Sequence, residues 1–172
     1  MSEIEEILKS DKKNKEKVQA LAGALKRDKA SVRELIECFG RGTTGEKGTC
    51  MEAITVVTEE APQFAENCLD FIFEHLDDEA PRVKWEAARI IGNVAKAFPE
   101  EAAEAVPALL ASTSDEGTVA RWSAAFALAE IAKANTGKRK ELIAKFEAIL
   151  KRENNNGVRN VYIKAMKTME RM

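Results

Sequence analysis

The chain has 172 residues, which is enough to bury a hydrophobic core without disulfides or metals. Hydrophobic residues make up 45% and charged residues 33%, a mixture that excludes a disordered or fibrous protein. The formal net charge is only −2, so the global charge gives no support for a protein that binds nucleic acids or membranes.

Apolar residues recur at helical spacing along almost the whole chain, and Gly or Pro residues separate the periodic segments. Asp28, Asp115 and Thr136 are predicted N-caps. The pattern predicts an all-α protein with helices over residues 2–9, 14–27, 29–39, 45–60, 63–77, 80–97, 100–113, 117–134, 137–152 and 156–170.

The N-terminal segment is charged from its third residue and lacks the apolar region of a secretory signal. No stretch approaches the roughly 18 consecutive apolar residues that a membrane-spanning helix needs. We therefore expect a soluble, cytoplasmic protein with no membrane partner.

The sequence repeats itself at an offset of 37 residues. The segment VKWEAA at 83–88 matches ARWSAA at 120–125, and the same offset relates Ile91 to Leu128. One helix pair cannot bury its own apolar face, whereas stacked pairs share a continuous core. The repeat therefore predicts about four stacked helix pairs, and a compact bundle with chance similarity between its helices is the alternative.

The repeat also predicts how the chain is organised. We expect one domain over residues 1–172, in which residues 1–27 form a degenerate helical cap. The repeat units are expected at residues 28–60, 61–97, 98–134 and 135–172.

This pattern resembles the HEAT-repeat family. The matching features are Asp78 and Asp115, each followed six residues later by a basic residue, Lys84 or Arg121, and then by a second helix rich in small residues. Pro107 within a first helix is a further similarity, because a proline often kinks that helix in the family. The resemblance covers most of the chain after its first two helices and implies a right-handed α-α superhelix, a HEAT-like solenoid.

The first and last units depart from this pattern. Gly48 and Asn160 stand where the other units have tryptophan, and Glu153 replaces the aspartate in the last unit. The 37-residue period is also shorter than the roughly 40–47 residues typical of HEAT and armadillo units.

The basic residues of the repeat form a column, which consists of Lys47, Lys84, Arg121 and Arg159. A phosphate-binding surface is one interpretation of this column. The resemblance implies another interpretation, which we favour, because acidic residues recur at the same offset and would pair with the basic ones of the same or the next unit. The predicted structural ladder consists of Asp78, Lys84, Asp115, Arg121, Glu153 and Arg159.

The tryptophans are the candidate partner-binding residues. On a helix whose core positions are 83, 87, 91 and 94, Trp85 points away from the core, and Trp122 is its repeat equivalent. Arg89 and Phe126 lie one turn further along the two helices. The resemblance implies a concave aromatic–arginine patch, and Trp and Arg are enriched in binding hot spots. Packing of both indoles between adjacent helices is an equally weighted alternative.

Charge is distributed unevenly. Residues 41–135 carry a net charge of −9, residues 136–172 carry +6, and residues 1–40 carry +1. Solvated helix faces are the favoured explanation. A nucleic-acid contact and head-to-tail self-association with the acidic middle are the alternatives.

No motif for catalysis or metal binding is present. The three cysteines and the single histidine are too few and too irregularly spaced for a disulfide framework or a zinc site, so the cysteines are expected in the core. A phosphate-binding loop and a nucleophile motif are both missing. The sequence therefore predicts a non-catalytic protein with no cofactor, no metal, and no catalytic or cofactor-binding residues.

The predicted function is a protein-interaction or scaffold module that binds an unidentified protein through its concave face. The alternative is nucleic-acid binding, because some HEAT-like proteins are DNA glycosylases for alkylated bases, and Trp with Arg on a concave face faintly resembles that class. The acidic middle, the short chain and the lack of a convincing catalytic Asp beside the tryptophans disfavour this alternative.

Overall fold

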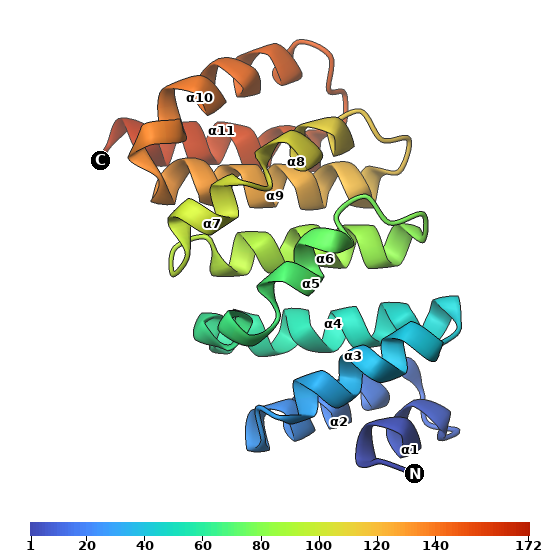
Figure 1. Ribbon diagram of the computed structural model, residues 1–172. Coiled ribbons are helices and arrows are strands. Elements are labelled where there is room, and N and C mark those ends of the chain that lie inside the picture. The colour runs from blue at the N-terminus through green and yellow to red at the C-terminus, as the bar shows by residue number, and fades with distance from the viewer. The chain divides into compact units, whose positions relative to one another are not determined.

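The computed structural model describes residues 1–172, which form helices and no strands (Figure 1). The chain divides into two compact units, Met1–Ala87 and Ala88–Met172. Helix α6 (Pro81–Val94) begins in the first unit and ends in the second. None of the helices is long and apolar enough to cross a membrane.

The first unit is built around the long helices α2 and α4. α2 packs along α4, while α1 lies against α2 and α3. Its core contains fully buried Leu21, Leu25, Leu35, Met51 and Ile54. Before α6, its elements are α1 (Glu3–Lys9), α2 (Asn14–Arg27), α3 (Ser31–Arg41), α4 (Thr44–Glu60), the 3-10 helix η1 (Pro62–Asn67) and α5 (Leu69–Glu74).

The second unit is built around α9. Figure 1 shows α9 beside α7, α8, α10 and α11, and it contacts each of them. Alanines at 124, 125, 127 and 132 are fully buried, and their small side chains let the surrounding helices approach closely. After α6, the elements are α7 (Pro99–Ala103), α8 (Val106–Ser112), α9 (Thr118–Ala134), α10 (Thr136–Leu150) and α11 (Asn156–Glu170).

The predicted helix over residues 100–113 is two short helices, α7 and α8. Pro107 lies in the first turn of α8, where its missing N–H is not needed. In a continuous helix the proline ring would clash with the carbonyl group of Ala103, four residues earlier. The chain therefore ends α7 at Ala103 and starts α8 at Val106, a full break where the sequence predicted a kink.

The predicted helix over residues 63–77 is also interrupted. It consists of η1 and α5, with a break at Cys68, whose φ is −148° and ψ is 13°. The backbone N–H of Phe64 donates to the carbonyl oxygen of Ala61 (3.0 Å), and that of Cys68 donates to the carbonyl oxygen of Ala65 (3.0 Å), which is the three-residue spacing of the 3-10 conformation.

The predicted N-caps Asp28 and Asp115 are wrong by two residues. The residues that precede α3 and α9 as N-caps are Ala30 and Gly117. Each aspartate instead accepts a hydrogen bond from the backbone N–H of that residue, at 3.0 Å for Asp28 and 2.8 Å for Asp115. Aspartate side chains readily accept hydrogen bonds from backbone N–H groups two residues later in turns. These side chains therefore order the loops rather than the first helical turn.

Thr136 is likewise not an N-cap, because α10 already begins at this residue. The cap is Asn135, whose Oδ1 accepts a hydrogen bond from the Lys138 N–H (3.2 Å). Asn135 Nδ2 also donates to the carbonyl oxygen of Pro99 (3.2 Å), so one buried amide both starts α10 and holds the start of α7.

Candidate functional site

Two aromatic side chains on α9 and one arginine on α6 come together in the second unit. The rings of Trp122 and Phe126 are stacked, with centroids 5.6 Å apart and planes 5° from parallel. The Arg89 guanidinium lies over the indole, 5.9 Å from the ring centroid, in a cation–π arrangement. We call Arg89, Trp122 and Phe126 the aromatic–arginine cluster.

A glycine on α6 makes the cluster possible. A Cβ atom on Gly92 would lie 2.6 Å from Phe126 Cδ2 and 3.2 Å from the Cα atom of Ala127. No side chain larger than hydrogen fits there without a shift of the ring or of the backbone. Phe126 is therefore held between the Gly92 backbone and the indole of Trp122.

The cluster is only partly covered. Trp122 is 36% exposed, and Val119, three residues earlier on the same face of α9, is 49% exposed. Apart from the terminal methionines, these are the only large hydrophobic side chains that are exposed. Phe126 and Arg89 are half-buried beside them. The face of α9 thus presents a rigid apolar surface of the kind that binding partners cover.

Trp85, the other predicted binding residue, belongs to the first unit. It lies on α6 and is half-buried. The structure therefore brings three of the four predicted residues together within one unit.

Sequence reasoning missed a polar site in the first unit. Gly48, where the repeat would have tryptophan, is covered by the side chain of Arg82. A Cβ atom on Gly48 would lie 2.8 Å from Arg82 Cδ and 2.9 Å from Nη1. Arg82 Nη2 donates to Asn14 Oδ1 (3.0 Å) and lies 3.4 Å from the Glu52 carboxylate. The glycine at the tryptophan position was the signal available in the sequence.

Asn14 connects this polar site to α4. Its Oδ1 also accepts from Thr49 Oγ1 (2.7 Å), and its Nδ2 donates to Glu52 (3.3 Å). A cavity of about 400 Å³ opens beside the network. Arg82 and Asn14 line it together with Leu8, Lys17, Thr43, Gly45, Glu46 and Thr49.

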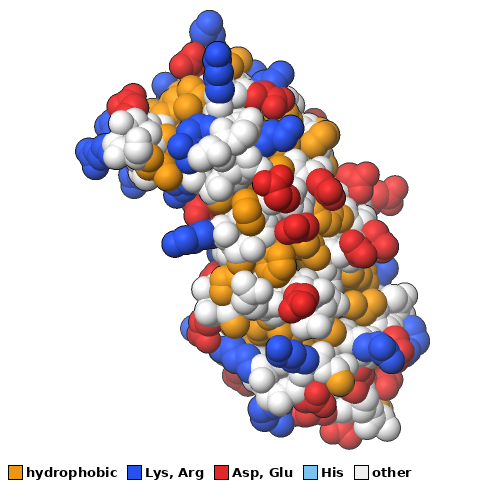
Figure 2. All heavy atoms as spheres, turned by 60° about the vertical axis from the view of Figure 1, so that its left-hand side comes forward, with side chains coloured by type: hydrophobic (Ala, Val, Ile, Leu, Met, Phe, Trp, Pro, Cys, Tyr) orange, Lys and Arg blue, Asp and Glu red, His pale blue; other side chains and the backbone are white.

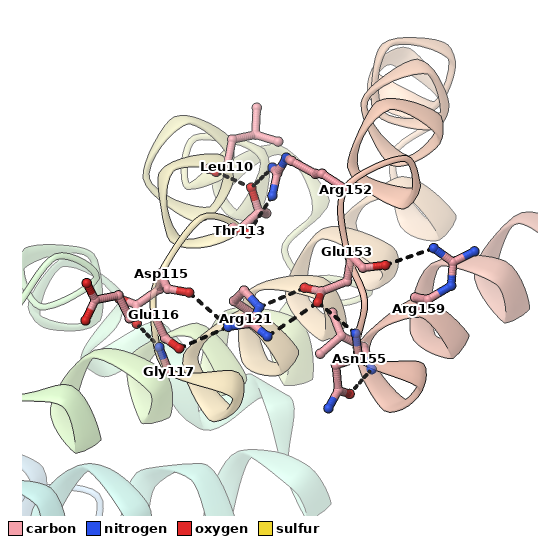
Figure 3. Close-up of polar contacts among 11 residues, drawn as sticks. Leu110, Thr113, Asp115, Glu116, Gly117, Arg121, Arg152, Glu153, Asn155 and Arg159 are labelled. Atoms are coloured by element: carbon pink, nitrogen blue, oxygen red, sulfur yellow. Dashed lines mark hydrogen bonds and ion pairs between the residues drawn. The ribbon is translucent and has the colours of Figure 1, made fainter.

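Arg121 is the clearest element of the predicted ladder (Figure 3). Its Nε donates to Glu153 Oε1 (2.8 Å), and its Nη2 lies 3.4 Å from Oε2. Nη1 of the same guanidinium donates to the carbonyl oxygens of Asp115 and Glu116, both at 3.1 Å. Arg159 in the last unit donates in the same way to the Glu153 carbonyl oxygen (2.9 Å). The arginines thus hold loops in place, and the guanidinium of Arg121 also pairs with an acid.

The acidic members of the ladder share one local structure. Each side chain accepts a hydrogen bond from the backbone N–H two residues later, at the entrance to a second helix. The pairs are Asp78 with Ala80 (2.8 Å), Asp115 with Gly117 (2.8 Å) and Glu153 with Asn155 (3.1 Å). Lys84, the remaining ladder residue, is half-buried on α6 in the first unit.

Two of these carboxyl groups are held in the charged form. Burial alone raises the pKa of Glu153, but hydrogen bonds from Arg121 and from the Asn155 N–H outweigh it, and the pKa lies below its ordinary value. Burial likewise raises the pKa of Asp78, whereas the Ala80 N–H and His75, whose Nδ1 lies 2.8 Å from Asp78 Oδ2, lower it overall.

All three cysteines are buried and unpaired, and all belong to the first unit. Burial raises the pKa of Cys50 and of Cys68 to about 12, and it also raises the pKa of Cys38. These thiols therefore behave as small core side chains. No group of three or more His, Cys, Asp or Glu side chains is placed to hold a metal ion.

Basic side chains gather over α10 and α11. Figure 2 shows them at the top of the view, where Figure 1 draws these two helices. Some of the arginines order loops: Arg139 donates to the carbonyl oxygen of Lys133 (2.9 Å), and Arg152 donates to that of Thr113 (2.9 Å). The exposed positive charge of this region is therefore carried largely by lysines.

Comparison with known proteins identifies the repeat. A family profile described as HEAT repeats matches residues 69–167. A designed armadillo repeat protein in complex with the peptide (KR)4 is 17% identical, with a TM-score of 0.68 over 94% of this chain and 78% of that one. A second designed armadillo repeat protein is also 17% identical, with a TM-score of 0.71 over 95% and 79% of the two chains.

A further engineered protein is 20% identical, with a TM-score of 0.69 over 98% of this chain and 79% of that one. At these identities the likeness shows the fold, an all-α arrangement similar to armadillo and HEAT repeat solenoids. No curated protein matched the sequence.

Proposed function

Because the chain belongs to the HEAT repeat family, we propose that it is a non-catalytic protein-interaction module. In the second unit its partner contacts the aromatic–arginine cluster and the neighbouring Val119. The observation that carries this proposal is that Trp122 stacks on Phe126 and lies under the Arg89 guanidinium, and yet is 36% exposed. A pre-ordered aromatic ring loses little side-chain entropy when a partner covers it, which is the character of a binding hot spot.

The comparisons support a peptide or protein as the partner. Repeats of this family stack to form extended surfaces, and such surfaces bind other chains. A solved structure with a similar fold holds a peptide. The chemistry of the cluster agrees, because two aromatic rings and a guanidinium offer apolar area and hydrogen-bond donors but no nucleophile or general base.

The experiment is a comparative affinity capture in cells that express the natural protein. The tagged chain, its Trp122→Ala variant and an Ile143→Ala control are expressed at equal levels, and co-purifying proteins are quantified by mass spectrometry. Ile143 is a half-buried apolar residue on α10, so the control removes similar apolar volume away from the cluster.

We expect one or more proteins to be captured by the wild type and by the control, and to fall at least tenfold with Trp122→Ala. A tenfold loss corresponds to about 1.4 kcal/mol, and a loss of about thirtyfold reaches the roughly 2 kcal/mol that defines a hot spot. Circular dichroism establishes that all three proteins are folded. Equal capture by the folded Trp122→Ala variant would reject the cluster as the binding site.

A further inference from the structure

The exposed face of α9 changes from apolar to charged side chains along its length. Val119, Trp122 and Phe126 are followed, at helical spacing, by Glu130 and Lys133. The distance along the helix from Trp122 to Lys133 is about 16 Å, given a rise of about 1.5 Å per residue. The face therefore begins with an apolar surface and ends with charged groups.

A cavity of about 410 Å³ lies at the charged end of this face. It belongs wholly to the second unit and is lined by Lys96, Glu130, Lys133, Ala134 and Met172. Lys133 forms an ion pair with Glu130. Lys96 is exposed and makes no ion pair, so the side chains that line the cavity carry two ammonium groups and one carboxylate.

The neighbouring helix adds further positive charge. α11 packs along α9, and the last unit follows the preceding one at an offset of 38 residues, which relates Arg121 to Arg159. At this offset Lys164 takes the place of Phe126 on α11. Lys164 is exposed. Helix α11 therefore adds a further ammonium group at the position equivalent to Phe126.

From this charge pattern we infer that the partner segment is an acidic peptide with one apolar anchor residue, an inference that rests on the proposed function. The anchor packs on Trp122 and Val119, and carboxylates of the peptide reach Lys96 and Lys133. An extended chain advances about 3.3 Å per residue, so about five residues separate the anchor from the acidic positions. Charge complementarity of this kind fixes the direction of the peptide on the face.

A peptide fits this surface better than a nucleic acid does. A phosphate backbone carries a negative charge at every nucleotide and would meet the Glu130 carboxylate in the cavity. It also offers no aliphatic group to cover Val119, which is 49% exposed. A peptide places its charges only where the ammonium groups are.

The test selects binding peptides without knowledge of the natural partner. The full chain is used to screen a phage library of random twelve-residue peptides. We expect the selected peptides to combine a large apolar residue with two or more Asp or Glu residues four to six positions away. Their dissociation constants are then measured by fluorescence anisotropy at several salt concentrations.

Charge-reversal variants identify the lysines that are used. The double variant Lys96→Glu with Lys133→Glu is expected to weaken binding at least tenfold. The matched control, Lys140→Glu with Lys145→Glu, makes the same change in net charge at two exposed positions of α10 and is expected to change binding less than twofold. The neutral variant Lys96→Gln with Lys133→Gln is expected to weaken peptide binding by an intermediate amount. It takes the place of the charge-reversed variant if that variant does not fold.

Several results would overturn the inference. It is overturned if the selected peptides are basic or uncharged, or if the selection yields no peptide. It is also overturned if the α10 control variant loses as much peptide binding as the Lys96→Glu with Lys133→Glu variant. Tighter binding of a twelve-nucleotide oligothymidine than of any peptide would replace the peptide with a nucleic acid. Peptides that are lost with Trp122→Ala but lack acidic residues would reject this inference and leave the proposed function intact.

Discussion

Arg121 pairs with Glu153, which lies 32 residues later in the chain, through a two-point contact between guanidinium and carboxylate. The Glu153 side chain is only 4% exposed, and that of Arg121 is 20% exposed. The same guanidinium donates to the carbonyl oxygen of Asp115 in the loop before its own helix. Two successive loops of the second unit are thus joined by one side chain.

We predict that Arg121→Ala lowers the free energy of unfolding by about 2–3 kcal/mol. The substitution leaves the buried carboxylate of Glu153 without its charged partner, which is costly in a shielded site. Urea unfolding monitored by circular dichroism measures the effect. The control is Lys138→Ala, which removes an exposed pair with Glu141 and should cost less than about 0.5 kcal/mol. Equal losses in the two variants would contradict the prediction.

The pH dependence of stability should show the contribution of Glu153. Its pKa in the folded protein lies below its ordinary value of 4.5, so the folded state favours the charged form. The resulting stability is fully present above that ordinary value and is lost as the pH falls through the lower pKa of the folded protein. Unfolding measured from pH 7 down to pH 3 should therefore depend less on pH in Glu153→Gln than in the wild type. Parallel curves for the two proteins would count against this assignment.

Gly92→Ala should disturb both stability and binding. The new methyl group would overlap the Phe126 ring, so we expect a loss of about 1–3 kcal/mol. We also expect weaker partner capture, because Trp122 rests on that ring. Gly23→Ala is the matched control, since nothing lies within 4 Å of a Cβ there, and it should stabilise α2 by about 0.5–1 kcal/mol. Thermal unfolding of both variants distinguishes these opposite signs.

The substitutions Gly48→Ala and Arg82→Ala should have non-additive effects on the free energy of unfolding. In the wild type, the gain in helix propensity from Gly48→Ala is opposed by contact with the Arg82 side chain. In an Arg82→Ala background that contact is absent, and the same change should stabilise the protein by about 0.5–1 kcal/mol. A double-mutant cycle of unfolding free energies measures the difference. A coupling energy of zero would mean that Arg82 moves aside without cost.

The two tryptophans should matter more for binding than for folding. We predict that the double variant Trp85→Ala with Trp122→Ala loses partner capture while its far-ultraviolet circular dichroism stays that of the wild type. Both side chains are partly exposed, so their loss opens no enclosed cavity in the core. The single variants apportion the loss between the two units. Capture that survives in the folded double variant would exclude both residues as anchors.

The sequence predicted the helical architecture well because the repeat is a local pattern. The helix expected over residues 14–27 coincides with α2 (Asn14–Arg27), and the one over 156–170 coincides with α11 (Asn156–Glu170). Where Pro107 divides α7 from α8, periodicity alone could not show whether the helix bends or breaks, because both allow the same apolar positions.

The site was predicted less completely, since its geometry depends on neighbouring helices. Helical spacing indicated that Trp122 and Phe126 share a ridge, but it could not show that Gly92 of another helix supports the ring. In the sequence, Gly48 is only a departure from the repeat. The pattern could not show that the Arg82 side chain lies across it, because a missing side chain carries no information about what fills the space.

The location of the three buried thiols has a practical consequence. Cys38, Cys50 and Cys68 all lie in the unit Met1–Ala87, and the other unit has none. Cys50 and Cys68 are enclosed by the core, so a reagent that modifies thiols reaches these two when that unit opens, and the rate at which they are labelled measures its opening. The natural cysteines therefore report the opening rate of the unit Met1–Ala87, and no engineered label is needed.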